Sequence, residues 1–314
     1  MNDRPVVSFC ATNLNTVDRL ARSLASIDRL GEGLGLSYEV VVADGPSTDG
    51  ARALLEARAR SAGHFHLVTH GERNRGYGRR RAFEASQGAT VVPFDTSIDY
   101  DPQYGRLIES YIGLGTDRML FSEVCALSRH SIESVGGWRD LVGGEDIDLY
   151  SRIIRQFGVI AFPTATPGSQ SARLGSVARQ LRYVGGSRVR RLRRVFEVQR
   201  DQMIGCNFRV ADLMRFNQEK SALTRLGLWF FFAGCAVGAR WRGIPPIRAE
   251  KNNYLLFREA LLRSLMAEDH RKIPWAGPPP RLLLTEAEIR YLSATSELWQ
   301  SMGEEVHRYV GSKP

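Results

Sequence analysis

The chain has 314 residues, of which 43% are hydrophobic and 25% are charged, and its formal net charge is +9. This composition excludes a disordered chain, and the length suffices for one large domain or for one domain with an extension. Four scattered cysteines without a Cys-x-x-Cys pair argue against a zinc site and a disulfide framework, and they fit a reducing compartment. The first residues lack a basic segment followed by an apolar one, so we expect no secretory signal.

Short apolar runs alternate with segments of helical periodicity over the first 95 residues. In chain order, the expected elements are a strand at 5–12, a helix at 16–30, a strand at 38–44, a helix at 51–62, a strand at 65–70, a helix at 76–88 and a strand at 90–95. This alternation with short turns predicts right-handed βαβ units, and therefore an α/β fold with a mostly parallel sheet flanked by helices.

Three polar residues fall at the carboxyl ends of these expected strands, namely Thr12, Asp44 and Asp95. Ligands of open parallel sheets bind beyond the carboxyl ends of the strands. We therefore expect these three side chains to converge on one binding site.

A second group of carboxylates follows a Gly-Gly-Trp sequence and opens a predicted helix. Glu145 and Asp146 are neighbours there, and neighbouring helix residues point about 100° apart. Only one of the two is therefore expected to face a substrate. We interpret Asp148 as a carboxylate favoured by the dipole at the start of the helix.

Strand signals end near residue 165, which divides the chain into a predicted α/β domain at 1–165 and a basic helical region at 166–314. Residues 170–200 contain nine arginines and one glutamate, which predicts either a solvated helix face or a surface for phosphate groups or an anionic membrane. Residues 226–239 are uncharged and mostly apolar, but a membrane span needs about 20 such residues. This segment is predicted to be either a buried core helix or a helix in a membrane interface. Because an apolar block fits nucleic acid poorly, we expect peripheral membrane contact and no nucleic acid.

Three motifs over about residues 5–160 resemble those of family 2 glycosyltransferases, which have the GT-A fold. They are VVVADGPSTDG at 40–50, NRGYGRRRAFEASQGATVVPFD at 74–95 and GGWRDLVGGEDIDLYSR at 136–152. The resemblance implies an enzyme that moves a sugar from a nucleotide diphosphate sugar to a hydroxyl acceptor, with inversion at the anomeric carbon. Residues 1–165 would then be the GT-A catalytic domain.

The resemblance also implies where the donor binds. Asp44 would bind the base or ribose, although an aspartate before Gly45 is also a common turn former. Arg79 would face the nucleotide, unless it belongs to a solvated helix face. The nucleotide-sugar site is expected to comprise Thr12, Asn13, Asp44, Gly45, Arg79 and Asp95.

Asp95 occupies the expected metal position, where Mg²⁺ or Mn²⁺ would offset the charge of the diphosphate. The family usually has a second carboxylate two residues later, but this chain has Ser97 there. Either Asp95 and water hold the ion, or Asp99 replaces the missing carboxylate. The alternative for Asp99 is a residue of a turn before the next helix.

On the acceptor side, Asp146 is the candidate catalytic base, with Glu145 beside it. Trp138 and Gly137 are predicted to contact the acceptor, where the indole would stack on a sugar ring; plain core packing is the alternative. The acceptor is expected to be lipid-linked or a polysaccharide of the cell envelope, reached at the cytoplasmic face of the membrane. The competing functions are a polyprenyl-phosphate sugar synthase and a catalytically weak nucleotide-sugar-binding protein, for which Ser97 is the main argument.

Overall fold

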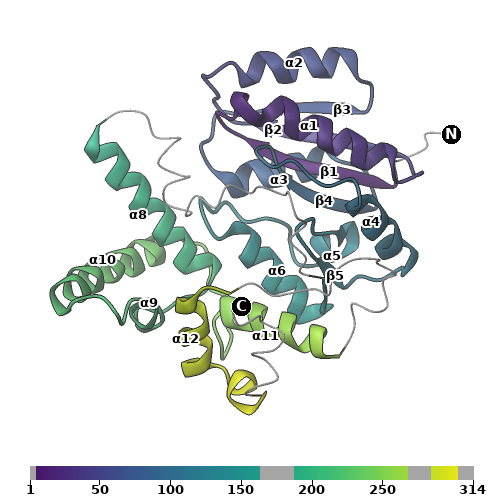
Figure 1. Ribbon diagram of the computed structural model, residues 1–314. Coiled ribbons are helices and arrows are strands. Elements are labelled where there is room, and N and C mark those ends of the chain that lie inside the picture. Colours follow the sequence, from purple (N-terminus) through teal and green to yellow (C-terminus); the bar gives the residue numbers. More distant parts are fainter. Residues whose placement is uncertain (1–4, 163–186, 268–283, 303–314) are drawn as a thin grey trace.

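The computed structural model describes residues 5–162, 187–267 and 284–302. Its centre is a five-stranded sheet with the strand order β3-β2-β1-β4-β6 (Figure 1). The strands are β1 (Val7–Asn13), β2 (Tyr38–Asp44), β3 (Phe65–Thr69), β4 (Thr90–Asp95) and β6 (Leu127–Ser128). All pairs are parallel except β4 with β6. Two short strands, β5 (Met119–Phe121) and β7 (Val159–Ala161), form a second parallel pair. The predicted α/β fold with a mostly parallel sheet is confirmed.

Both faces of the main sheet are covered by helices, which explains why its strands read as continuous apolar runs. Along β1, Phe9 faces one hydrophobic core while Cys10 faces the other. The first core includes α1 (Val17–Glu32), α2 (Ala51–Ser61) and α4 (Tyr104–Gly113). The second includes α3 (Arg75–Ala85), α5 (Arg129–Ser134) and α6 (Glu145–Gln156). The two layers of helices cover the faces of the sheet, and the connecting loops lie at its carboxyl edge.

The helices after residue 187 belong to two different parts of the molecule. α11 (Asn253–Met266) and α12 (Glu286–Thr295) pack into the second core, and the Ala161 backbone N–H donates to Ser264 Oγ at 2.9 Å. In contrast, α8 (Arg188–Gly205), α9 (Val210–Phe216) and α10 (Ala222–Trp241) project away from the sheet as an arm (Figure 1). The C-terminal half is helical in its described residues, as predicted, but α11 shares the core of the first half. The boundary at residue 165 remains a prediction.

Candidate functional site

A pocket lies at the carboxyl edge of the main sheet, where β1 and β4 end. The parallel register places Asn13 beside Asp44 and Thr12 beside Asp95, so the predicted convergence of strand ends is present. The residues that line the pocket come from these strand ends and the segments that follow them, from the segment between β3 and α3, from α3 and from α8; they are Thr12, Asn13, Leu14, Thr16, His70, Glu72, Arg73, Asn74, Arg75, Arg79, Asp95, Thr96 and Arg194.

Asp44 does not line the pocket but is hydrogen-bonded to Asn13, which does. Its carboxylate is fully buried and accepts hydrogen bonds from Asn13 Nδ2 at 2.8 Å, from Ser47 Oγ at 2.7 Å and from Arg52 Nε. Asn13 in turn accepts a bond from Thr96 Oγ1 at 3.0 Å, which ties the ends of β1, β2 and β4 together. Asp44 is absent from the pocket lining, so it orients a lining side chain and does not itself face the cavity.

Gly45 begins the turn that closes the end of β2. Its backbone N–H donates to the Asn13 carbonyl at 2.9 Å, and a Cβ at this position would lie 3.2 Å from the Glu72 carbonyl. A side chain would therefore crowd the segment that carries the pocket residues after β3. Of the six residues predicted for the nucleotide-sugar site, four line the pocket. Asp44 and Gly45 do not line it, but both are hydrogen-bonded to the lining residue Asn13.

Arg79 is buried, so the alternative of a solvated helix face is wrong for this residue. One Nη donates to the Phe94 carbonyl at 2.7 Å and to the Cys10 carbonyl at 3.3 Å, which fixes the guanidinium behind the strand ends. Its Nε lies 3.7 Å from Asp146 Oδ1. Burial lowers the pKa of Arg79 and Asp146 raises it, with a raised pKa as the result. Arg79 thus joins the pocket to the start of α6.

The side chains of Glu145 and Asp146 have different environments at the start of α6, as their adjacency predicts. Glu145 is buried and pairs with Arg75 Nε at 3.1 Å; burial raises its pKa, and the Arg75 charge opposes that shift. Asp146 keeps 26% of its side chain exposed. Its Oδ1 accepts a hydrogen bond from Trp138 Nε1 at 3.1 Å. Of the two carboxylates, Asp146 is the one open to a substrate.

Trp138 and Gly137 differ from the predicted acceptor contacts. The Trp138 residue is 2% exposed and its ring packs against Phe83, with ring centroids 5.8 Å apart, so core packing describes it and the ring is not available to stack on a sugar. Gly137 adopts φ +68°, and its carbonyl accepts a bond from Arg152 at 2.7 Å. Both residues shape the turn before α6, and Trp138 contributes to the site by holding Asp146.

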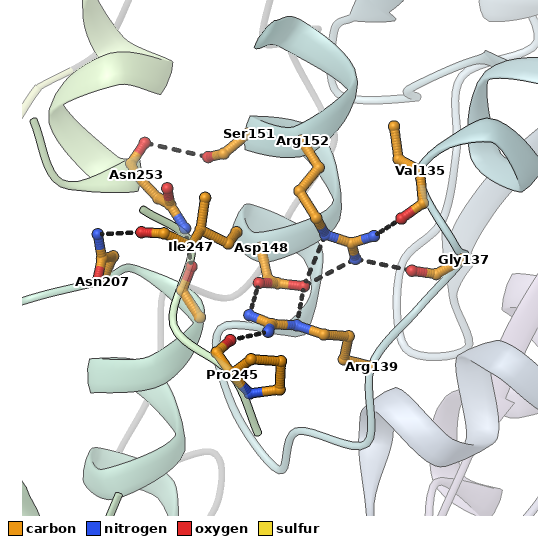
Figure 2. Close-up of polar contacts among 11 residues, drawn as sticks. Val135, Gly137, Arg139, Asp148, Ser151, Arg152, Asn207, Pro245, Ile247 and Asn253 are labelled. Atoms are coloured by element: carbon orange, nitrogen blue, oxygen red, sulfur yellow. Dashed lines mark hydrogen bonds and ion pairs between the residues drawn. The ribbon is translucent and has the colours of Figure 1, made fainter. Parts of the chain in front are cut away.

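Asp148 is a buried crosslink (Figure 2). Arg139 Nε donates to its Oδ2 at 2.9 Å, and Arg152 Nη2 donates to the same oxygen at 2.8 Å. Arg139 also donates to the Pro245 carbonyl at 2.7 Å, beyond the end of α10. The expected interaction with the helix dipole is therefore accompanied by two ion pairs that the sequence did not reveal. They fix the turn that carries Trp138.

The loop before α6 also rests on α8. The Val142 backbone N–H donates to the buried carboxylate of Asp201 at 2.8 Å. Gly205 lies so close to the Gly144 carbonyl that a Cβ on Gly205 would collide with it. The position of Asp146 thus depends on a helix of the arm.

The predicted metal ligands Asp95 and Asp99 are not brought together. Asp95 lines the pocket, and its Oδ1 accepts bonds from the Ser97 backbone N–H at 3.1 Å and from Ser97 Oγ at 2.9 Å. Asp99 instead pairs with Arg29 at 3.3 Å, lies outside the pocket lining and is about half exposed, with 47% of its side chain accessible. In residues 5–162, 187–267 and 284–302, no cluster of three or more His, Cys, Asp or Glu side chains could hold a metal. Asp95 nevertheless fits an ion that takes its other ligands from phosphate oxygens and water.

Several pocket residues were missed by the sequence reasoning. Four arginines line the cavity, and Arg194 reaches it from α8, where its Nη1 donates to the Arg73 carbonyl at 3.0 Å. His70 lines the pocket with two buried ring nitrogens that have no hydrogen-bond partner in the described part of the chain, and burial lowers its pKa. His70 ends the third predicted strand, so the convergence of strand ends that predicts Asp44 as a site residue also predicts His70. No sequence signal distinguishes Arg194 from the arginines beside it.

The structure is thus an α/β sheet with an arginine-lined pocket at its carboxyl edge and the partly exposed carboxylate of Asp146 close to the lining residue Arg79. Residues 8–109 match the family model described as glycosyl transferase family 2. The predicted resemblance to family 2 glycosyltransferases is therefore confirmed for residues 8–109.

Solved structures are similar at low sequence identity. TarS 1–349 from S. aureus in complex with UDP has 13% identity and a TM-score of 0.40; the match covers 46% of this chain and 55% of that chain. The mannosyltransferase from Pyrobaculum calidifontis in complex with GDP-Man and Mn²⁺ has 15% identity and a TM-score of 0.47, covering 98% and 86%. Glucosyl-3-phosphoglycerate synthase from Mycobacterium tuberculosis, with Mn²⁺, UDP and phosphoglyceric acid, has 20% identity and a TM-score of 0.41, covering 56% and 76%. No curated protein matches the sequence. At TM-scores below 0.5, these similarities add nothing to the assignment.

Proposed function

We propose that the protein transfers a sugar from a nucleotide diphosphate sugar to a hydroxyl group, with inversion at the anomeric carbon. The observation that carries this proposal is the place of Arg79, which lines the pocket and approaches Asp146 Oδ1 to 3.7 Å. A donor whose diphosphate lies in the pocket would therefore present its sugar close to an exposed carboxylate.

In the proposed reaction, the acceptor oxygen forms a bond to the anomeric carbon while the bond from that carbon to the diphosphate breaks. The acceptor proton passes to Asp146, and the nucleotide diphosphate leaves with the bonding electron pair. A base in this position contributes about 10²- to 10⁴-fold to the rate. The Trp138 N–H, at 3.1 Å from Asp146 Oδ1, holds the carboxylate in one orientation.

The charge of the leaving diphosphate would be met by the pocket arginines, because planar guanidinium groups bind phosphate oxygens in pairs of hydrogen bonds. Arg194 and Arg73 line the pocket from two different segments and are our candidates for this role. When Mg²⁺ or Mn²⁺ is bound at Asp95, it would supply additional positive charge to the same diphosphate.

We further propose an acceptor at a membrane surface, either lipid-linked or a growing polysaccharide, on the cytoplasmic side. A polyprenyl-phosphate acceptor would require the same donor site and would differ only in the attacking oxygen. The exposed Asp146 supports transfer over the alternative of a catalytically weak binding protein, since a protein that only binds the donor has no need of a base.

Donor binding can be tested by thermal unfolding with UDP-, GDP- and dTDP-sugars, each with and without Mn²⁺. At least one donor should raise the melting temperature, because a ligand at 100 times its Kd stabilises the folded state by about 2.7 kcal/mol. Arg194→Ala should weaken the shift, whereas Arg22→Ala, on the exposed face of α1, should leave it unchanged. Absence of any shift across the panel would overturn the proposed donor site, and a shift without sugar transfer to any acceptor would favour the binding protein.

A further inference from the structure

An apolar stripe runs along the exposed face of α10. Its members recur at intervals of three, four and seven residues, so they lie on one side of the helix. They are Leu223, Leu226, Phe230, Val237 and Trp241, which are 82%, 55%, 64%, 55% and 87% exposed. Soluble proteins seldom leave so many large apolar side chains of one helix in water. The stripe therefore requires a partner.

The opposite face of α10 is anchored within the arm. Phe232 and Cys235 are buried and pack with Met203 of α8 and Leu213 of α9. By length and composition α10 could cross a membrane, which is weak evidence taken alone. Crossing would break these contacts, so the helix is placed to lie along a surface. The prediction of a buried core helix is wrong for most of residues 226–239 and holds for Phe232 and Cys235.

The charges of the arm indicate the chemistry of the partner. The first turns of α8 expose Arg188, Arg190, Arg191 and Arg193, and no Asp or Glu occurs in residues 221–249. A second copy of this chain would bring these like charges together and be repelled. An anionic lipid surface would instead attract the arginines and accept the apolar stripe at the boundary of its head groups.

We propose that the arm of α8, α9 and α10 docks on an anionic lipid bilayer, with the α10 stripe in the interface and the exposed α8 arginines on the head groups. α8 also carries Arg194 into the pocket, so docking would hold the pocket beside the lipid surface. This docking rests on the arm alone and stands whether or not the proposed sugar transfer is correct.

Sedimentation with vesicles of phosphatidylglycerol and phosphatidylcholine tests the electrostatic part. At low salt the protein should sediment with these vesicles and not with phosphatidylcholine alone, and added salt should release it. The triple variant Arg190→Gln, Arg191→Gln, Arg193→Gln should bind about fivefold more weakly for each arginine removed. Arg194 is left intact because it lines the pocket. A matched control removes three exposed arginines of the sheet half, Arg22, Arg60 and Arg106, and should bind like the wild type.

The stripe is tested by Phe230→Ser, which should weaken vesicle binding by at least about tenfold. Leu114→Ser, at an apolar residue exposed on the sheet half, should have no effect. Independently of any destabilising variant, vesicles should shift the tryptophan emission of the wild type to shorter wavelength, and Trp241→Phe should reduce that shift. Indifference of the wild type to anionic vesicles at low salt would overturn the proposal. So would equal losses in the two arginine triples, or a dimer in solution that Phe230→Ser dissociates.

Discussion

The sheet half and the arm depart from the usual burial pattern in opposite directions. Around the sheet edge, charged side chains are buried: Asp44, Arg79, Glu145 and Asp148 are all at most 6% exposed. In the arm, large apolar side chains are exposed, up to 87% at Trp241. Ordinary domains bury apolar residues and leave charges in water.

The two departures differ in whether partners within the molecule compensate for them. Each buried charge has a partly exposed partner of opposite charge, which makes its geometry depend on complete networks; the partners are Arg52, Asp146, Arg75, Arg139 and Arg152. The exposed apolar residues have no such compensation within the described part of the chain, and that marks them as a surface for something else. The buried charges belong to the proposed reaction and the exposed stripe to the proposed docking, and the following experiments separate the two proposals.

The largest effect is expected for Asp146→Asn, because the variant removes the proposed base while keeping its shape. Turnover should fall by about 10²- to 10⁴-fold with nearly unchanged donor affinity. The measurements are steady-state kinetics and donor titration. Glu145→Gln should cost less turnover, since Glu145 is buried against Arg75. Wild-type turnover in Asp146→Asn would remove Asp146 from the mechanism.

Asp148→Ala should lower the free energy of unfolding by about 3 kcal/mol, because it leaves Arg139 and Arg152, which are only 18% and 14% exposed, without their buried counter-charge. Urea unfolding measures this loss. Glu84→Ala provides the control, since its ion pairs with Arg80 and Arg81 are exposed and should contribute at most about 1 kcal/mol. Similar losses in both variants would mean that burial of charge does not distinguish the sheet half.

Within α10, two phenylalanines two positions apart provide a direct comparison. Phe232→Ala removes a buried ring and should cost about 3 kcal/mol or more of unfolding free energy. Phe230→Ala removes an exposed ring and should change it by no more than about 0.5 kcal/mol. Thermal unfolding without lipid measures both. A large loss in Phe230→Ala would show that the stripe is covered in solution.

The proposed metal position at Asp95 can be tested at Ser97, whose Oγ donates to Asp95 Oδ1 at 2.9 Å and therefore faces that carboxylate. Ser97→Asp should tighten Mn²⁺ binding severalfold, because a second carboxylate joins the first. Calorimetric titration with Mn²⁺ measures the change. Asp95→Ala should weaken donor binding in Mn²⁺, and EDTA should add little to that loss. If EDTA leaves wild-type activity intact, the arginines meet the diphosphate charge without an ion.

The smallest effect concerns pH. Burial lowers the pKa of His70 in the folded protein below its ordinary value of 6.5, so the unfolded chain binds a proton more readily. The wild type should therefore lose unfolding free energy as pH falls from about 7 to about 5. His70→Gln cannot bind this proton and should lose less over the same interval. Denaturant unfolding at several pH values measures the two slopes, and parallel slopes would contradict the buried state of His70.

Much of the fold follows from local patterns in the sequence. The strands are predictable because burial of both faces makes them continuous apolar runs. Asp95 and Thr12 are predictable as site residues because strand ends converge in parallel sheets. The different fates of Glu145 and Asp146 follow from the helical repeat alone.

The remaining site residues depend on tertiary neighbours that leave no local signal. An aromatic residue such as Trp138 can stack on a sugar ring, and the sequence alone allows that role. In the fold its ring is buried in the second core and packs against Phe83. The sequence predicts for Asp148 only an interaction with the helix dipole. Its ion pairs with Arg139 and Arg152 arise from the fold of the turn and helix that carry them. Arg194 is one of nine arginines in its segment, and only the path of α8 brings it to the pocket.

The close contact of Gly205 with Gly144 restricts how this enzyme can be shortened or recombined. The turn that presents Asp146 lies on α8, with Val142 bonded to Asp201 and the two glycines in backbone contact. A truncated protein that ends after β7 would keep the whole main sheet but lose the support beneath Asp146, the proposed base. A chimera with a foreign arm would need a glycine and an aspartate at the matching positions of its first helix. In an evolving lineage, the arm and the turn that carries Asp146 would therefore be inherited as a unit.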